Sequence, residues 1–592
     1  MMTRDMPPLV EATERRAGPP QRIAALWPSP AWLVVALTVL GAVTRFYHLG
    51  SRSLWLDETY TAQSVRFPTL GGVMTWTSGD PDQMPLMNLL AWMLRGFGGS
   101  EWSVRLPSAL AGTLDVLAIY YLATRLFRPR VGLVAALLVA ILPFSVWYGQ
   151  EARPYALLML LATLQILFSY RAAVYARARD WGALVLVTVL NLYTHYLSLF
   201  TTAAAYAFIG VALLMELAGA AIDKRPPPDC RRAVMQRLAR KAGAAVVAAA
   251  VTTAAYLPWL PYLVTFLGRR DLGFNRFATS HQATLAEVPG LMAAFNLSGP
   301  VLVLLCIGIV AVIVRATRGH WLEGGLLLLW LAIPLTGFWL KLHGAIVTVL
   351  PRYFSFLFPE AVLVTAAGVE AVAQVTARAL SAVARNATGV VSAAITALLL
   401  VQVLPLLAQS YQTPKDDYRD AAAYIIARSP PDSVVIAMGN CNLFIVQSLG
   451  YYLWQRHSSI TVIDGTRVDD RVALGLQRRK GRVWGAIFTH CFPPNSLDRL
   501  STAGLAVTQF VGIALVRQRA PAATVTAQTR ALLRWGSPRQ PQLLATLDLL
   551  DILRHNAALG ANLLPAPGGT GAAPLAERWV LTRGAALAPD HH

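Results

Sequence analysis

Two adjacent carboxylates stand in an apolar setting near the start of the chain. Asp57 and Glu58 follow Leu54, the amphipathic Trp55 and Leu56, and Trp55 is a candidate for lining the same site. A solvated pair of loop charges is the plain alternative, but the apolar flanks argue against it. Carboxylates gathered at a membrane interface can hold a general base with a raised pKa, or bind a cation. Further acids that the topology predicted below places on the same face are Asp80, Asp82 and Glu151.

The segment Tyr148–Tyr155 carries an acid and a base close together, Glu151 and Arg153. An ionisable group between two membrane spans usually faces a cavity, which favours a function for Glu151. For Arg153 the alternative is equally good, since it can pair with Glu151 and cap the neighbouring helices.

Cationic residues suited to an anion follow later in the chain. Arg352, which precedes Tyr353, is permanently charged, and its fork of N–H groups matches phosphate oxygens. The alternative is an arginine that snorkels to the membrane surface. His195 lies in a polar string at the end of another apolar run, where interfacial hydrogen bonding is the plainer interpretation. Three more candidates, for which a lipid headgroup is the alternative partner, are Arg269, Arg270 and Arg276.

The composition indicates that these residues are held in a membrane. Of the 592 residues, 55% are hydrophobic and 14% charged, and the mean hydropathy is +0.49. A soluble protein carries about 25% charged residues. The net charge of +20 arises mainly from short basic loops between apolar runs, as the positive-inside rule expects. Membrane lipids are therefore expected partners, and nucleic acid is not.

Eleven runs come close to the roughly 20 apolar residues that a spanning helix needs. They are 30–49, 106–125, 131–148, 154–170, 181–197, 199–218, 243–263, 300–316, 321–340, 353–373 and 388–408. The fold class predicted for 30–408 is thus a polytopic all-α membrane domain with about eleven transmembrane helices, located in the inner membrane.

The basic loops predict the orientation of this domain. Those at 125–131, 171–181, 219–242, 316–321 and 374–387 all fall on one side of the zigzag, which is then cytoplasmic. Segment 1–29 is predicted to be cytoplasmic as well, and the first run to be an uncleaved span that ends at the interface with Arg45–His48. An odd number of spans places the C-terminus outside the cytoplasm.

The same zigzag places four polar stretches on the outer face: 50–105, 147–155, 264–300 and 341–352. The candidate residues lie in or beside them. Within the first stretch, Met84–Arg95 is apolar but too short to span, so it is predicted to be an interfacial or re-entrant helix.

A small extracytoplasmic α/β domain is predicted over 409–563, followed by a flexible tail over 564–592. Asp416–Arg428 has the pattern of an amphipathic helix. The short apolar runs that predict buried strands are Ser433–Met438, Ile460–Ile463, Val483–Phe488 and Val507–Ile513. Cys441 and Cys491 follow the first and third of these strands. If those strands are parallel, the two sulfurs meet at the same end of the sheet, which predicts a disulfide in an oxidising compartment.

Five strings, in order along the chain, resemble the GT-C membrane glycosyltransferases. They are Leu54–Glu58, Gly98–Glu101 continued by Arg105–Ala109, Tyr148–Tyr155, Tyr193–Tyr196 and Pro351–Tyr353. The chain is similar in particular to the bacterial relatives of protein O-mannosyltransferases, a branch that includes the lipid A aminoarabinose transferase and the rhizobial galacturonosyltransferases. The likeness covers roughly the first 410 residues, and Lys415–Tyr424 with Asp432–Val435 resembles the start of the family's C-terminal domain.

The resemblance implies an inverting transfer of a sugar from a polyprenyl-phosphate carrier to an acceptor hydroxyl on the extracytoplasmic face. Asp57 matches the family's general base, and Glu58 and Glu151 would orient the acceptor or tune that base. Arg352, with Tyr353 and one arginine of the 264–300 loop, would bind the leaving phosphate. Whether a divalent metal ion joins Asp57 and Glu151 to the phosphate stays open, as does the nature of the cell-envelope acceptor: lipid, glycan or protein.

One motif departs from the family pattern. Many relatives have His-Pro-Pro-Leu preceded by an acid in the first outer loop, whereas this chain reads Asp80-Pro81-Asp82-Gln83-Met84-Pro85-Leu86. Gln83 takes the place of the histidine, so a role of that histidine in binding metal or acceptor is in doubt here. Asp80 and Asp82 are candidates to compensate.

A transporter or flippase of lipid-linked sugars is the alternative function. It would share the spans, the basic loops and a lipid groove. It would need neither the acid pair in an outer loop nor the C-terminal domain, and transporters tend to carry charges at the membrane midplane.

Overall fold

The computed structural model describes residues 31–518 apart from 81–82, 223–227, 269–280, 283–287, 343–345, 348–350, 380–386, 432, 439–441, 465–482 and 490–504. The predictions for segments 1–29 and 564–592 lie outside these residues. So do those for Asp82, Arg269, Arg270, Arg276, Cys441 and Cys491.

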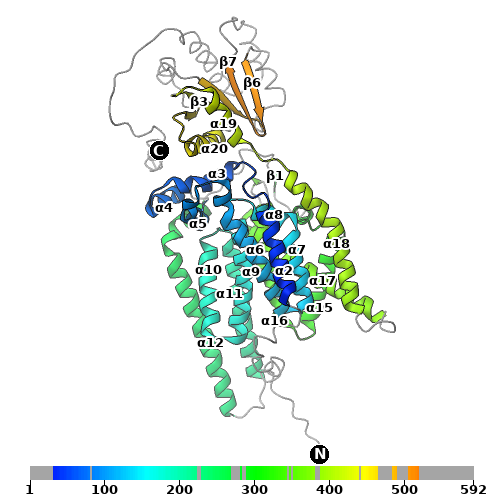
Figure 1. Ribbon diagram of the computed structural model, residues 1–592. Coiled ribbons are helices and arrows are strands. Elements are labelled where there is room, and N and C mark those ends of the chain that lie inside the picture. Colours follow the sequence, from blue (N-terminus) through cyan, green and yellow to red (C-terminus); the bar gives the residue numbers. More distant parts are fainter. Residues whose placement is uncertain are drawn as a thin grey trace, which may run out of the picture.

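The N-terminal part is a bundle of long helices (Figure 1). They are α2 (Ala31–Phe46), α6 (Glu101–Leu126), α7 (Pro129–Ile141), α8 (Pro143–Gly149), α9 (Tyr155–Tyr175), α10 (Ala178–Leu192), α11 (Ser198–Ile222), α12 (Pro228–Tyr256), η4 (Leu257–Trp259), α13 (Leu260–Gly268), α15 (Pro300–Thr317), α16 (Trp321–Leu342), α17 (Phe358–Ala379) and α18 (Ala387–Gln412). Each of the eleven predicted spans falls mainly on one of these helices, except 131–148, which is divided between α7 and α8, and 243–263, which runs through α12, η4 and α13.

The described helices confirm a polytopic all-α membrane domain. Seven of those that the structure describes are long and apolar enough to cross a membrane, or eight if the bent pair α7–α8 is one span. The apolar helices Ala31–Phe46 and Trp321–Gly337 are shorter, and α10 has 15 residues. The total of eleven therefore stays a prediction.

A proline breaks the third predicted span. Helices α7 and α8 meet at 58° at Pro143, which has no N–H to give to the carbonyl of Val139. Arg45 Nη2 donates to that carbonyl at 2.8 Å. The next carbonyl, of Ala140, accepts a hydrogen bond from Thr44 Oγ1 at 2.9 Å. Side chains of α2 thus satisfy the backbone groups that the break releases.

Arg45 is fully buried to do this, and two glycines make room for its side chain. A Cβ at Gly112 would lie 2.4 Å from Arg45 Nε, and one at Gly149 would lie 2.9 Å from Arg45 Cγ. The prediction that Arg45 lies at the interface is therefore wrong, because its guanidinium is needed inside the bundle.

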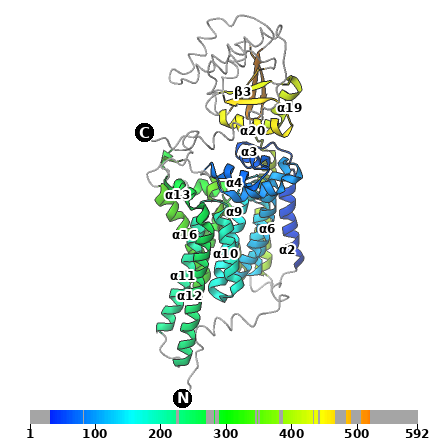
Figure 2. The same cartoon turned by 90° about the vertical axis from the view of Figure 1, so that its left-hand side faces the viewer.

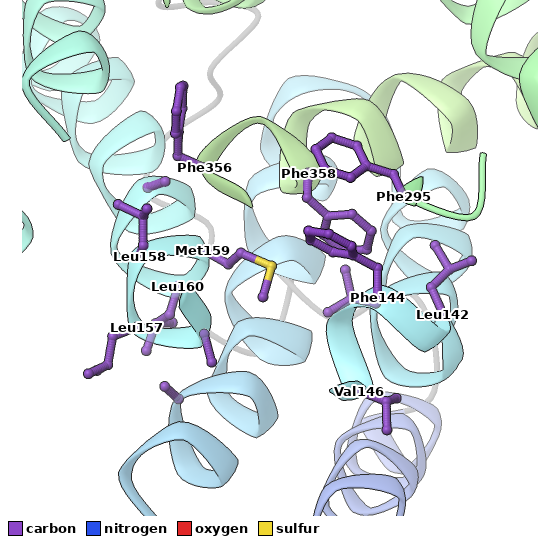
Figure 3. Close-up of a cluster of buried hydrophobic side chains, with 14 of the residues drawn as sticks. Leu142, Phe144, Val146, Leu157, Leu158, Met159, Leu160, Phe295, Phe356 and Phe358 are labelled. Atoms are coloured by element: carbon purple, nitrogen blue, oxygen red, sulfur yellow. The ribbon is translucent and has the colours of Figure 1, made fainter. Parts of the chain in front are cut away.

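An aromatic cluster beneath the break holds α8 in place (Figure 3). The ring of Phe144 on α8 lies 4.6 Å from that of Phe295 and 5.1 Å from that of Phe358 on α17, centroid to centroid. Met159 of α9 points toward the same cluster. This packing fixes the segment between α8 and α9, which carries Glu151.

Short helices cover one end of the bundle (Figures 1 and 2). They are α3 (Leu56–Gln63), η2 (Ser64–Arg66), α4 (Leu70–Ser78), α5 (Pro85–Met93), η3 (Leu94–Phe97), α14 (Val288–Ala294) and η7 (Pro351–Leu357). Helix α5 confirms the short helix predicted within Met84–Arg95. A ribbon of β1 (His281–Gln282) and β2 (Ile346–Val347) joins the segment between α13 and α14 to the segment just before η7.

The C-terminal part is a small α/β domain at this same end (Figure 1). Its five-stranded sheet has the order β4-β3-β5-β7-β6. The strands are β3 (Val434–Met438), β4 (Thr461–Asp464), β5 (Val483–Phe488), β6 (Leu505–Phe510) and β7 (Ile513–Gln518), and the helices are α19 (Tyr418–Arg428) and α20 (Asn442–Gln455). Strands β3 and β5 are parallel neighbours, so the premise of the predicted disulfide is confirmed.

The fourth predicted strand was wrong in extent. The run Val507–Ile513 is divided between β6 and β7, which form an antiparallel hairpin. Gly512 has φ of +74°, a backbone conformation that favours glycine and turns the chain. The hydrophobic run continues through the turn, which is why it reads as a single strand.

The C-terminal domain docks on the segment between α2 and α6 through α20, which packs on α3. The Tyr452 hydroxyl accepts a hydrogen bond from the Leu54 N–H at 2.7 Å and donates to Glu101 Oε1 at 3.0 Å. The neighbouring Tyr451 donates to the carbonyl of Gly99 at 2.5 Å. The backbone just before Asp57 is therefore held in part by the C-terminal domain.

Candidate active site

Asp57 and Glu58 open helix α3, where the N-terminal end of the helix dipole favours negative charge. Successive side chains on an α-helix point about 100° apart, so the two carboxylates meet different surroundings. Asp57 is 22% exposed, and its Oδ2 lies 3.4 Å from Arg352 Nη1. Glu58 is fully buried.

Glu58 is the most fully partnered acid of the site. Arg105 Nε and Nη2 each donate to its carboxylate at 2.7 Å. The N–H of Ala152 donates to Oε1 at 2.9 Å, and Lys415 Nζ donates to Oε2 at 3.2 Å. Burial alone would raise the pKa of Glu58, but the charges of Arg105 and Lys415 lower it to about 2. Glu58 therefore stays ionised and joins α3, α6 and the α8–α9 turn.

Glu151 lies in that turn and is almost fully buried. Trp147 Nε1 donates to its Oε1 at 2.8 Å, and Lys415 Nζ donates to the same atom at 3.3 Å. The other oxygen, Oε2, is buried without a hydrogen-bond partner. Burial raises the pKa of Glu151, while the charge of Lys415 opposes that shift. The alternative in which the side chains of Glu151 and Arg153 pair is not borne out, because the Glu151 carboxylate contacts Trp147 and Lys415 instead.

Arg352, at the start of η7, lies over two aromatic rings. Its guanidinium carbon is 5.5 Å from the ring centre of Trp55 and 5.7 Å from that of Tyr353. With the ion pair to Asp57, these contacts hold the side chain inward, against the alternative of simple snorkelling. Its Nε is buried with no hydrogen-bond partner, so a donor remains for an anion.

Arg153 is a second buried cation with an unused donor. Its Nη1 donates to the carbonyl of Asp57 at 3.2 Å and to Gln83 Oε1 at 3.4 Å, while its Nε has no partner. Gln83, the residue that departs from the family pattern, thus lies beside the backbone of Asp57.

A small pocket of about 20 Å³, room for about one water molecule, opens next to Arg153. It is lined by Thr61, Gln83, Met84, Met87, Asn88, Arg153, Pro154, Thr194 and His195. His195 Nδ1 accepts a hydrogen bond from the Leu197 N–H at 3.2 Å. Burial lowers the pKa of His195 to about 3, aided by the charges of Arg153 and Arg352. The imidazole is therefore neutral, with its proton on Nε2.

The structure thus gathers most of the predicted residues that it describes. Those that meet at the end of the bundle are Trp55, Asp57, Glu58, Glu151, Arg153, His195, Arg352 and Tyr353. Asp80 lies in the turn after α4, where its carbonyl accepts from the Gln83 N–H at 3.0 Å. Among the described residues, no three of the types His, Cys, Asp and Glu are grouped to hold a metal ion.

Sequence reasoning missed two cations of the site, Arg105 and Lys415. Arg105 belongs to a string that resembles the family, but its position at the start of a predicted span gives no sign of a role. Lys415 comes from the segment between α18 and α19, 357 residues after Glu58. No local pattern marks such a contact.

Comparison with known proteins agrees with this architecture. Residues 82–221 match the family described as dolichyl-phosphate-mannose-protein mannosyltransferase. ArnT from Cupriavidus metallidurans, in the apo state, aligns over 82% of this chain and 97% of its own, with 17% identity and a TM-score of 0.51. The chain has the GT-C fold. The resemblance inferred from the motifs is therefore confirmed.

The chain is also similar to a curated protein over a short segment. It is 35% identical over 125 residues to protein O-mannosyl-transferase 1 of Rattus norvegicus, which is 18% of this chain and 17% of the relative. The match thus spans less than a fifth of the length of that relative.

Proposed function

We propose that the protein is a glycosyltransferase that moves a sugar from a polyprenyl-phosphate carrier to an acceptor hydroxyl. The observation that carries the proposal is the pair of Asp57 and Arg352, whose charged atoms lie 3.4 Å apart while both side chains stay about one-fifth exposed. A base and a phosphate-binding cation side by side, both accessible, suit a reaction in which a hydroxyl attacks and a phosphate leaves. The matched family, described by a dolichyl-phosphate-mannose donor, supports this class of donor.

In the proposed reaction, Asp57 accepts the proton of the acceptor hydroxyl. The oxygen attacks the anomeric carbon as the bond from that carbon to the phosphate oxygen breaks, and the electron pair leaves with the polyprenyl phosphate. Attack from the side opposite the phosphate inverts the configuration. Arg352 and Arg153, whose Nε atoms are buried donors without partners, would stabilise the phosphate charge.

Glu58 has a different part in this scheme. Its five hydrogen bonds and a pKa of about 2 leave it no proton to exchange near neutral pH. It would hold α3 so that Asp57 faces the acceptor. Gln83, near the backbone of Asp57, and the pocket beside it suit an uncharged acceptor or sugar hydroxyl.

The decisive test replaces the carboxylate of Asp57 by an amide of nearly the same shape, which cannot act as the base. Asp57→Asn should lower the rate of sugar transfer by about a hundredfold or more, since a general base contributes about 10² to 10⁴, while binding of the polyprenyl-phosphate donor persists. Purified protein reconstituted in liposomes with a donor and an envelope acceptor gives both quantities. Asp420→Asn, on the exposed surface of α19, is the matched control and should transfer normally.

Two outcomes contradict the proposal. Near-normal transfer by Asp57→Asn excludes Asp57 as the base. Movement of a lipid-linked sugar across the bilayer by the wild type without transfer to any acceptor would identify the protein as a flippase.

We further propose an inner-membrane location with segment 1–29 in the cytoplasm and the α/β domain outside it. The basic loops support this orientation. A reporter that is active only in the cytoplasm, fused after Gln412, should be inactive, and one active only outside should be active. The reverse pattern would contradict the orientation and leave the catalytic proposal intact.

A further inference from the structure

Lys415 is buried beside Glu58 and Glu151 at the end of the helical bundle, although it belongs to the connection to the C-terminal domain. Its side chain is 5% exposed, and its Nζ lies 3.2 Å from Glu58 Oε2 and 3.3 Å from Glu151 Oε1. The ammonium also lies 5.0 Å from the ring centre of Trp147. A lysine is seldom buried to this degree unless its charge is paired with an anionic group.

The two carboxylates depend on Lys415 to different extents. Glu58 already receives two hydrogen bonds from Arg105 and one from the backbone of Ala152. Glu151 receives one from the neutral Trp147, and Lys415 is the cation in direct contact with it among the described residues. Without Lys415, burial and the negative charges of Glu58 and Asp57 would be opposed by the charge of Arg352, which is a weaker influence on Glu151 than Lys415. The buried Glu151 would therefore tend to take up a proton.

The docked domain determines where this ammonium lies. The Asp417 N–H donates to the carbonyl of Val511 in the β6–β7 turn at 2.8 Å. Arg419 Nη2 donates to the carbonyl of Ser51 at 2.8 Å. The residues that follow Lys415 are thus tied both to the C-terminal sheet and to the first outer loop.

We infer that Lys415 is a positioning residue, supplied by the C-terminal domain, that keeps Glu151 ionised and its free oxygen aimed at the acceptor. The inference rests on the proposed function, and it goes further by assigning Glu151 Oε2 as the acceptor-binding atom. An ionised carboxylate with one unpartnered buried oxygen is a strong hydrogen-bond acceptor for a hydroxyl. Loss of Lys415 should therefore harm the use of the acceptor and spare the use of the donor.

The first arm of the test needs no enzymatic activity. Lys415→Met leaves Glu151 without its cation and should lower Tm, and Lys415→Met combined with Glu151→Gln should recover a large part of that loss. A second ion pair with a buried lysine, whose carboxylate partner is 38% exposed, serves as the control. Lys241 Nζ donates to Glu216 Oε1 at 2.6 Å and its side chain is 3% exposed. Glu151→Gln added to Lys241→Met should recover nothing.

The second arm measures transfer. Lys415→Met should raise the acceptor KM about tenfold with an unchanged donor KM, and Glu151→Gln should do the same. The double variant should be no worse than either single variant, because both remove the same interaction. Lys415→Arg should recover more activity than Lys415→Met, and Lys241→Met should leave both KM values unchanged.

The outcomes separate this inference from the proposed function. Additive Tm losses for Lys415→Met and Glu151→Gln, or equal rises in the acceptor and donor KM, would overturn the role of Lys415. If the wild type transfers no sugar from any polyprenyl-phosphate donor, the proposed function fails. The Tm values of the two single variants and the double variant then still decide whether the charge of Lys415 compensates that of Glu151, since this measurement requires no substrate.

Discussion

Two neighbouring residues of one helix turn mark two regions of opposite character. Around Glu58 each carboxylate oxygen accepts hydrogen bonds from at least two donors, and the group is sealed from solvent. Around Asp57 and Arg352 the contacts are longer, both side chains are partly exposed, and Arg352 keeps a buried donor without a partner. A saturated buried ion pair builds a site, whereas groups with spare hydrogen-bonding capacity can still act on a substrate.

Of the changes that test the difference between the two regions, a substitution of Glu58 is expected to have the largest effect. Glu58→Gln leaves the guanidinium of Arg105 buried beside a neutral amide, so we expect a destabilisation of about 3–5 kcal/mol. Thermal unfolding in detergent and the yield of folded protein measure it. Glu101→Gln is the matched control. Glu101 pairs at 3.4 Å with an arginine that is 30% exposed, and a glutamine amide oxygen can still accept the hydrogen bond from Tyr452, so the loss of stability should be smaller. Equal Tm values for wild type and Glu58→Gln would show that this region is not the structural one.

The pH dependence of stability offers a check on the same residue. The folded pKa of Glu58 is about 2, below its ordinary value of 4.5, so its stabilising effect is present above about pH 4.5 and is lost as the pH falls toward 2. Glu58→Gln should lack this part of the acid dependence.

Sequence reasoning anticipated the partly exposed region around Asp57 and Arg352 better than the sealed region around Glu58. Asp57, Glu151 and Arg352 are expected together because the span pattern places their loops on one face. The cations that organise them could not be found in that way. The contact of Lys415 with Glu58 joins residues 357 apart, and it depends on how the C-terminal domain docks.

Some errors had a visible cause in the sequence. Pro143 stands inside a predicted span, and a proline in that position predicts a break. Gly512 stands inside a predicted strand, where glycine often marks a turn or bulge. The inward position of Arg45 had no such mark, because it depends on space left by Gly112 and Gly149 on other helices.

A change at Arg352 tests the partly exposed region around Asp57 and Arg352. Arg352→Ala should weaken the use of the donor about tenfold to a hundredfold, because one charge-assisted contact is worth about 1.5–3 kcal/mol. The acceptor KM should change less. Arg128→Ala is the control, since Arg128 is 58% exposed and pairs with Glu370 at 3.5 Å. An unchanged donor KM would assign Arg352 to anchoring alone.

The smallest expected effect concerns His195, at the pocket beside Arg153. Its pKa is lowered from 6.5 to about 3 by burial, so the folded state resists protonation and loses stability as the pH falls from about 6.5 toward 3. His195→Gln removes this dependence, and we expect it to lose about 1 kcal/mol less than wild type between pH 6.5 and 5.5. Denaturant unfolding at the two pH values measures the difference. Parallel losses in both proteins would show that His195 is solvated.

The docking of Tyr452 on Leu54 has a consequence for biosynthesis. The ribosome makes the acid pair and most of the bundle long before it makes α20, yet the backbone that leads into the acid pair is held by a hydroxyl from α20. The nascent chain therefore inserts its helices with an unfinished site. The site is completed only when the C-terminal domain has been synthesised and folded onto the bundle. A product truncated before α20 would therefore be inserted in the membrane without the hydrogen bond that holds this backbone.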